Sequence, residues 1–174
     1  GPACHFFVGG IDVDPQCRSS AQGLFAAGEV VGGLHGANRL SGNACMEMLV
    51  EGEIAGRGAG EYALQGDRLQ VPRDLAESLV RQALSPLEAV EGTAPYGLRR
   101  SLRGLAWQSV GVVRHADALD RGVEDLKRLR RDANPSACRS KQRLYNREWL
   151  CALENRNLID LADVVVRSAR VREE

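Results

Sequence analysis

A glycine-rich loop at residues 28–43 most constrains how this chain can fold. It holds five glycines together with one acid, one imidazole and the guanidinium of Arg39. The short apolar run at residues 23–27 predicts a buried strand before the loop, and residues 44–63 predict a helix after it. A loop that leads into a helix start offers backbone N–H groups and a positive dipole end to an anion. Arg39 can hold a carboxylate through two parallel hydrogen bonds, so the loop predicts a site for an anionic ligand.

Two motifs resemble the flavoprotein subunit of succinate dehydrogenase and fumarate reductase, a family whose relatives include L-aspartate oxidase. The first motif has Gly-Glu at residues 28–29, His-Gly-Ala-Asn-Arg-Leu at residues 35–40 and Gly-Asn at residues 42–43. The second has His-Phe at residues 5–6, where the family has His-Tyr, and Gly-Gly-Ile at residues 9–11. An identical run of six residues is far more specific than a lone glycine fingerprint.

The resemblance implies that Arg39 and His5 are the catalytic residues and that both hold carboxylates of a dicarboxylate substrate. Phe6 lacks the hydroxyl of the family's tyrosine, so no hydrogen bond from that group transfers to this chain. His35 lies in the same loop, and the only use we assign to it is orienting the loop.

The resemblance also implies that FAD is the cofactor and that Glu29, Asn43, Ala44 and Cys45 bind it. Glu29 would accept a hydrogen bond from a ribose or ribityl hydroxyl, although it could instead cap the loop. The helix start at Ala44 and Cys45 would stabilise negative charge on the reduced flavin. The family usually has serine at the position of Ala44, so only a backbone contact transfers there. Ser41 or Asn43 is expected to cap the helix.

Three glycines in the predicted helix, Gly52, Gly56 and Gly60, recur every four residues. Each interior glycine costs about 1 kcal/mol relative to alanine. We therefore expect this stripe to pack closely against another backbone, which would be the sheet of a nucleotide-binding domain.

The next stretch is expected to connect two domains. Residues 65–73 are polar and predict a linker that ends at Pro72, and residues 91–96 predict a second connector. Between them we expect a helix that ends at Ser85-Pro86, with one apolar face made of Leu75, Leu79 and Ala83.

From residue 97 onward the pattern predicts three amphipathic helices in a small bundle. The first would bury Leu98, Leu102, Leu105 and Val112. The second would start at Asp117 as N-cap with Asp120 in the first turn, bury Leu119, Val123, Leu126 and Leu129, and end before Asn134-Pro135. The third would run from Ser140 or Arg147 to Arg170 and bury Leu150, Leu153, Leu158, Leu161 and Val165. Residues 111–114 and 154–162 resemble the helical domain of the same family, more weakly than the loop does.

Composition excludes several classes of function. Lysine plus arginine and aspartate plus glutamate both number 23, which argues against a nucleic-acid or anionic-membrane partner. No run of 18 apolar residues and no signal peptide is visible, so we expect a cytoplasmic protein that reaches membranes only through a partner subunit. The five cysteines, at positions 4, 17, 45, 138 and 151, lack Cys-x-x-Cys spacing, so we expect free thiols and no metal site.

The expected fold is mainly α with a small β part. Residues 1–68 would be the C-terminal piece of an α/β FAD-binding domain, residues 69–96 a linker with a short helix, and residues 97–174 a helical domain. No Gly-x-Gly-x-x-Gly fingerprint is present, so we expect the C-terminal portion of a longer flavoprotein whose N-terminal remainder completes the FAD site. By themselves, these residues should bind FAD poorly and show no turnover.

The expected function is hydride transfer between flavin and a dicarboxylate. The first alternative is an amino-acid oxidase that resembles L-aspartate oxidase, because all these enzymes would share a carboxylate-binding arginine. The second is that the helical half mainly docks an iron–sulfur subunit or another copy of the protein. The motifs leave open which anion is used, the direction of the reaction, the electron partner and whether FAD is covalently attached.

Overall fold

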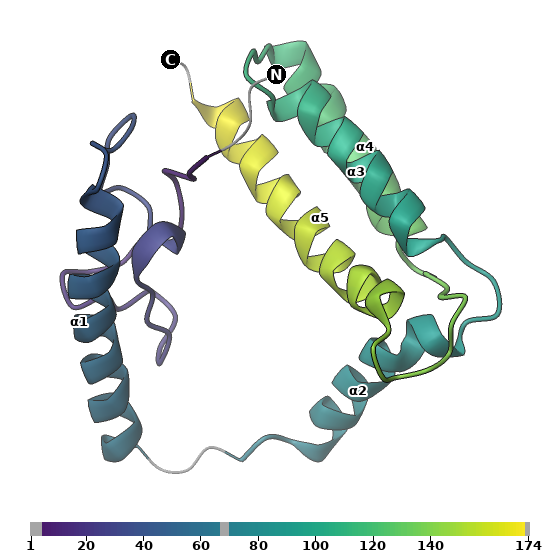
Figure 1. Cartoon of the computed structure of the whole chain (residues 1–174), viewed down its shortest axis with the longest axis horizontal. Coiled ribbons are helices and arrows are strands. Elements are labelled where there is room, and N and C mark those ends of the chain that lie inside the picture. The colour runs from purple at the N-terminus through teal and green to yellow at the C-terminus, as the bar shows by residue number, and fades with distance from the viewer. Residues whose placement is uncertain (1–4, 67–69, 173–174) are drawn as a thin grey trace. The chain divides into compact units, whose positions relative to one another are not determined.

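The computed structural model describes residues 5–66 and 70–172. The chain divides into two compact units, residues 1–70 and residues 71–174 (Figure 1). The predicted fold class, mainly α with a small β part, is confirmed. Cys4 and the domain boundary expected at residue 68 lie outside the described residues.

The first unit holds the 3₁₀ helix η1 (Gly28–Val30) and helix α1 (Asn43–Gln65). The strand predicted at residues 23–27 is wrong, because the described residues around it form only isolated bridges. These bridges join Ile11 to Val31, Val13 to Ser19 and Arg18 to Phe25. A ladder needs several consecutive backbone pairs, and each of these segments finds a partner at a single position.

A parallel backbone pair between Ile11 and Val31 brings two distant segments together. The Ile11 N–H donates to the Val30 carbonyl over 2.7 Å, and the Gly32 N–H donates to the Ile11 carbonyl over 3.0 Å. Glycine is needed on both sides of this pair. A Cβ at Gly10 would lie 2.1 Å from the Val30 oxygen, and one at Gly32 would lie 2.6 Å from the Gly10 nitrogen.

Helix α1 confirms the predicted helix, but its predicted capping is wrong. Gly42 is the N-cap in the left-handed region, with φ of 91°, and no side chain caps the helix. The glycine stripe at Gly52, Gly56 and Gly60 has no described atom within 4 Å of where a Cβ would lie. Instead, Gly58 receives the ring of Phe25, whose Cε1 would lie 2.9 Å from a Cβ. The sheet expected against the stripe stays a prediction.

The second unit is made of four helices among the described residues. They are α2 (Arg73–Glu88), α3 (Pro95–Val110), α4 (Ala116–Asp132) and α5 (Arg147–Val171). Helices α3, α4 and α5 pack against one another, and α2 packs on α5 (Figure 1). Ion pairs between α4 and α5 show that the two helices run antiparallel, because Arg130 meets Asp160 while Asp120 meets Arg170. Residues 69–96 were expected to form a linker with a short helix. In the structure this segment contains α2, a helix of 16 residues that belongs to the second unit.

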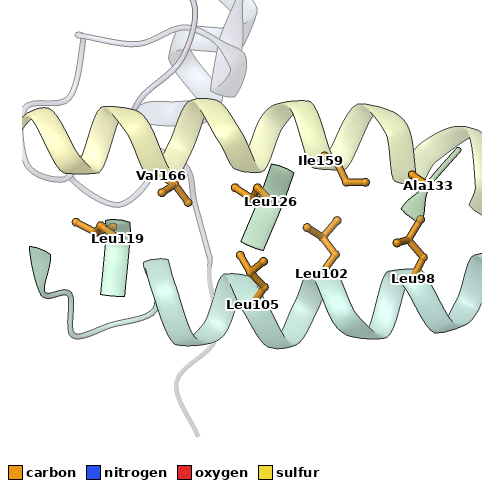
Figure 2. Close-up of a cluster of buried hydrophobic side chains, with 8 residues drawn as sticks. All are labelled: Leu98, Leu102, Leu105, Leu119, Leu126, Ala133, Ile159 and Val166. Atoms are coloured by element: carbon orange, nitrogen blue, oxygen red, sulfur yellow. The ribbon is translucent and has the colours of Figure 1, made fainter. Parts of the chain in front are cut away.

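The core of the second unit lies between α3, α4 and α5. Figure 2 shows the leucines of α3 directed toward Ile159 and Val166 of α5. Every predicted apolar position of α4 is buried or packed against this core, as is every one of α3 except Val112. Val112 is 72% exposed because α3 ends at Val110, before that position. The expected Asp117 cap is also wrong, since His115 is the N-cap of α4 and no side chain caps the helix.

The predicted apolar stripe of α5 is wrong in part. Leu150 and Leu161 are 55% and 52% exposed, whereas Leu158 packs against the core. The buried positions are instead Cys151, Ala152, Asn155, Ile159 and Val166. This buried face includes an amide and two β-branched side chains but no leucine, so leucine spacing alone points to a different face.

Asn155 is fully buried, and its hydrogen bonds join α5 to the start of α3. Its Oδ1 accepts from Arg99 Nε over 2.5 Å, and its Nδ2 donates to the Pro95 carbonyl over 2.8 Å. Both polar atoms of the amide therefore have partners, as a buried polar group requires.

The predicted end of α2 at Ser85-Pro86 is wrong, because the helix continues through Pro86 to Glu88. Proline at this position removes the hydrogen bond to the Gln82 carbonyl. That carbonyl instead accepts from Arg156 Nη1 over 2.9 Å and from the Ser85 hydroxyl over 2.9 Å. The leucines of the predicted apolar face, Leu75 and Leu79, are exposed.

Replacing Leu126 with alanine is expected to destabilise the helical unit by about 3 kcal/mol, because the side chain is 1% exposed and its loss leaves a cavity. Both tryptophans of the chain lie in this unit, so urea unfolding followed by tryptophan fluorescence reports on it alone. The matched control is Leu144→Ala, because Leu144 is 79% exposed and its loss should cost less than about 0.5 kcal/mol. Equal effects of the two substitutions would contradict this core.

Replacing Gly10 with alanine is expected to open the backbone pair between Ile11 and Val31. Overpacking costs about 1–3 kcal/mol, so the Ile11 and Gly32 amides should lose about tenfold or more of their protection from hydrogen exchange. Gly9→Ala is the control, because no described atom lies within 4 Å of a Cβ there. Unchanged exchange in the Gly10 variant would show that the pair does not depend on this glycine.

Candidate functional site

The two predicted catalytic residues meet in the first unit. Arg39 Nη2 lies 3.3 Å from His5 Nε2, although 34 residues separate them in the sequence. The backbone pair between Ile11 and Val31 explains this proximity, since it joins the segment after His5 to the start of the loop that carries Arg39. A guanidinium can only donate, so in this contact His5 Nε2 is the acceptor.

The Phe6 ring packs against the guanidinium of Arg39. The guanidinium carbon lies 4.1 Å from the centre of the Phe6 ring, which is a cation–π arrangement. In the sequence, the only notable feature of Phe6 is that it lacks the hydroxyl of the family's tyrosine. In the structure the Phe6 ring itself contacts the guanidinium of Arg39. The aromatic face remains when the hydroxyl is absent, so this contact does not depend on a tyrosine.

His35 pairs with Glu47, a residue that the sequence reasoning missed. His35 Nε2 lies 2.5 Å from Glu47 Oε2, and the two side chains are only 11% and 8% exposed. The His35 ring also packs against Phe6 in a T-shaped contact, with centroids 5.8 Å apart. One signal could have revealed Glu47: it is the only charged side chain among the first eight residues of α1.

Two buried polar atoms at this site have no hydrogen-bond partner among the described residues. They are Nε of Arg39 and Oε1 of Glu47. An unsatisfied buried group costs free energy, so each one calls for an explanation. A free N–H on a guanidinium is suited to an anionic oxygen, which fits a carboxylate ligand beside Arg39.

The residues predicted to bind FAD lie close by in the same unit. Glu29 is exposed, and its Oε1 accepts from the Phe7 N–H over 2.8 Å. Its other oxygen forms no hydrogen bond to the described residues, so it can accept one from a ligand. Asn43 and Cys45 are exposed at the start of α1, and their backbone N–H groups donate to Leu40 and Gly42.

The backbone around the start of α1 fits a flat, partly anionic group. Ala44 N–H donates to no described residue, and the helix has no acid in its first turn to compete for the positive end of its dipole. Three loop glycines with positive φ leave open space where a Cβ would lie: Gly33, Gly36 and Gly42. Such bare backbone allows the close approach of a ligand.

Three cysteine thiols of the described chain have raised pKa values. Burial raises the pKa of the Cys17 thiol, and nearby Glu51 and Asp14 raise it further. Burial also raises the pKa of Cys138 and Cys151 in the other unit.

Among the described residues no group of histidine, cysteine and acidic side chains could hold a metal ion. None of the described helices is both long and apolar enough to cross a lipid bilayer.

Two family models match the chain. A model described as the C-terminal part of fumarate reductase flavoprotein matches residues 99–174, and a model of an FAD binding domain matches residues 1–45. The two matches lie in different units, so each unit is matched in part, and neither model covers residues 46–98.

Curated relatives and solved structures agree with these models. The fumarate reductase flavoprotein subunit of Escherichia coli is 30% identical over 99% of this chain and 29% of its own length. L-Aspartate oxidase 2 from Ralstonia nicotianae is 32% identical over 99% of this chain and 28% of its own length. The Mycobacterium smegmatis Sdh1 complex in the apo form matches with a TM-score of 0.93 and 36% identity, over 100% of this chain and 30% of that one.

The chain thus spans about 30% of the length of the relatives that it matches. The matches extend over almost all of the chain, and the two family models name its parts separately. This chain belongs to the succinate dehydrogenase and fumarate reductase flavoprotein family, and its first residues are part of the FAD-binding domain of that family.

Proposed function

We propose that this chain forms one wall of the substrate site in an FAD-dependent oxidoreductase that transfers hydride between flavin and a dicarboxylate. The activity belongs to a longer protein, here called the parent flavoprotein. The observation that carries the proposal is the contact of Arg39 with His5, together with the buried Arg39 Nε that has no described partner.

Arg39 and His5 act by holding a carboxylate of the substrate. The guanidinium carbon lies 4.1 Å from the centre of the Phe6 ring, so this contact restricts the direction of the N–H groups before the substrate arrives. A pre-oriented donor binds a carboxylate without losing side-chain freedom at that moment, which is how positioning lowers a barrier. His5 contacts the same guanidinium, so both groups serve one carboxylate.

The chain also holds part of the cofactor. FAD supplies the isoalloxazine ring that gives or takes the hydride. The exposed oxygen of Glu29 would accept a hydrogen bond from a ribose or ribityl hydroxyl. The Ala44 N–H and the positive end of α1 would stabilise negative charge on the reduced ring. Asn43 and Cys45 lie on either side of Ala44 at this helix start, and we expect them to contact the FAD as well.

Oxidation of an amino acid is the second candidate function, because L-aspartate oxidase 2 is among the relatives at 32% identity. L-Aspartate and fumarate both carry two carboxylates, so a contact with Arg39 serves either of them. The two substrates differ in the ammonium group, for which Glu29 and the buried Glu47 each offer a carboxylate oxygen without a partner among the described residues.

The helical unit is proposed to dock other polypeptides. Several large apolar side chains are exposed on it: Trp107, Val112, Val113, Leu150, Leu161 and Val164. Exposed apolar groups of this size are typical of surfaces that other chains cover. The candidates are the N-terminal remainder of the parent flavoprotein, a second copy and an iron–sulfur subunit. Docking of this kind would also bring a cytoplasmic protein to a membrane.

Arg39→Lys in the parent flavoprotein is expected to lower kcat/KM for fumarate reduction about 100-fold. Lysine keeps the charge but cannot form two parallel hydrogen bonds, and a hydrogen bond to a charged group contributes about 1.5–3 kcal/mol. Steady-state kinetics with a reduced electron donor measures the change. Arg18→Lys is the matched control, since Arg18 forms an exposed pair with Asp14 and should leave kcat/KM unchanged. Equal kinetics in the two variants would refute the role of Arg39.

The parent flavoprotein is expected to reduce fumarate with a reduced donor and to leave L-aspartate unoxidised under oxygen. Flavin reoxidation by fumarate and hydrogen peroxide release with L-aspartate measure the two activities. Peroxide release without fumarate turnover would establish the second candidate function instead.

A further inference from the structure

We propose that His35 and Glu47 form a positioning pair that sets the direction of the Arg39 guanidinium through the ring of Phe6. This inference rests on the proposed function, because it names residues that act on the carboxylate site without touching the substrate. The four side chains form one continuous series of contacts in the first unit.

The pair with Glu47 fixes the His35 ring to helix α1. His35 Nε2 and Glu47 Oε2 share a hydrogen bond 2.5 Å long. Both side chains are about nine-tenths buried. A single short hydrogen bond between buried groups leaves the imidazole little freedom to rotate, so the loop that carries His35 is tied to the helix.

The His35 ring in turn restricts Phe6. The two rings meet at 68° with centroids 5.8 Å apart, which is the favoured edge contact of aromatic rings. Phe6 has its own face beneath the guanidinium of Arg39. A rotation of the Phe6 ring would remove that face, so the orientation of His35 is transmitted to Arg39.

The unsatisfied atoms lie at the two ends of this series. Glu47 Oε1 and Arg39 Nε are both buried without a described partner. A pair kept only for stability would be expected to satisfy both carboxylate oxygens, since an unmade buried hydrogen bond costs free energy. The free Arg39 donor is buried, and so is Glu47 at the other end of the series. This arrangement is consistent with a site prepared for a ligand.

The test measures binding of malonate to the FAD-loaded parent flavoprotein by isothermal titration calorimetry. Malonate is a dicarboxylate with no two-carbon centre to oxidise, so binding is observed without turnover. His35→Leu and Phe6→Leu are each expected to weaken malonate binding about tenfold, because misplacing a binding group by about 1 Å costs up to about a hundredfold. His35→Gln keeps an N–H donor and should retain more affinity than His35→Leu.

A double-mutant cycle separates positioning from general stability. In an Arg39→Ala background, His35→Leu is expected to change the malonate Kd by less than about twofold, since its effect passes through Arg39. The control Glu53→Gln changes an exposed acid on the same helix and should leave the Kd unchanged. Binding stoichiometry gives the folded fraction of each variant, so loss of folded protein is not mistaken for loss of affinity.

Three outcomes would overturn either the positioning pair or the proposed function. If Arg39→Ala weakens malonate binding while His35→Leu and Phe6→Leu do not, the positioning pair is wrong and the proposed function stands. An equal effect of His35→Leu with and without Arg39 overturns the pair as well. If Arg39→Ala leaves the Kd unchanged, the proposed function itself fails. Leucine at position 6 fills most of the space of the phenylalanine. The malonate Kd of Phe6→Leu therefore tests the positioning pair if His35→Leu does not fold.

Discussion

The hydrogen-bonded pair between Ile11 and Val31 is the constraint on which the candidate site depends. It joins the segment that follows His5 to the segment that leads to Arg39, and glycines at positions 10 and 32 let the two backbones approach. The first motif supplies Arg39 and the second supplies His5. Only their juxtaposition produces a guanidinium that an imidazole contacts and an aromatic ring supports, which is the arrangement proposed to bind a carboxylate.

The two units rely on different kinds of interaction. The helical unit has a dry core between α3, α4 and α5, with the buried amide of Asn155 connecting α5 to the start of α3. The first unit has few buried side chains, and backbone pairs and polar contacts hold its loops. This difference suits their roles, because a binding loop must keep donors free whereas a helical unit must bury apolar surface.

Helices were predictable where the apolar pattern was strong, and their buried faces were less so. In α4 every predicted apolar position reaches the core, whereas in α5 Leu150 and Leu161 are exposed and Ala152 and Asn155 are buried. Burial on α5 depends on which face meets α3 and α4, and the polar Asn155 on that face is buried through its hydrogen bonds, which hydrophobicity does not report. The predicted strand failed for a related reason, because pairing depends on a partner segment and not on local propensity.

The sequence by itself determined the family, the main helices and the two residues, Arg39 and His5, that the structure brings together. Tertiary structure alone decided that Phe6 lies under Arg39 and that Glu47 holds His35, 12 residues away. A local motif specifies its own backbone conformation, and the path of the whole chain decides which side chains meet. Contacts between separate segments therefore had to be observed in the folded chain.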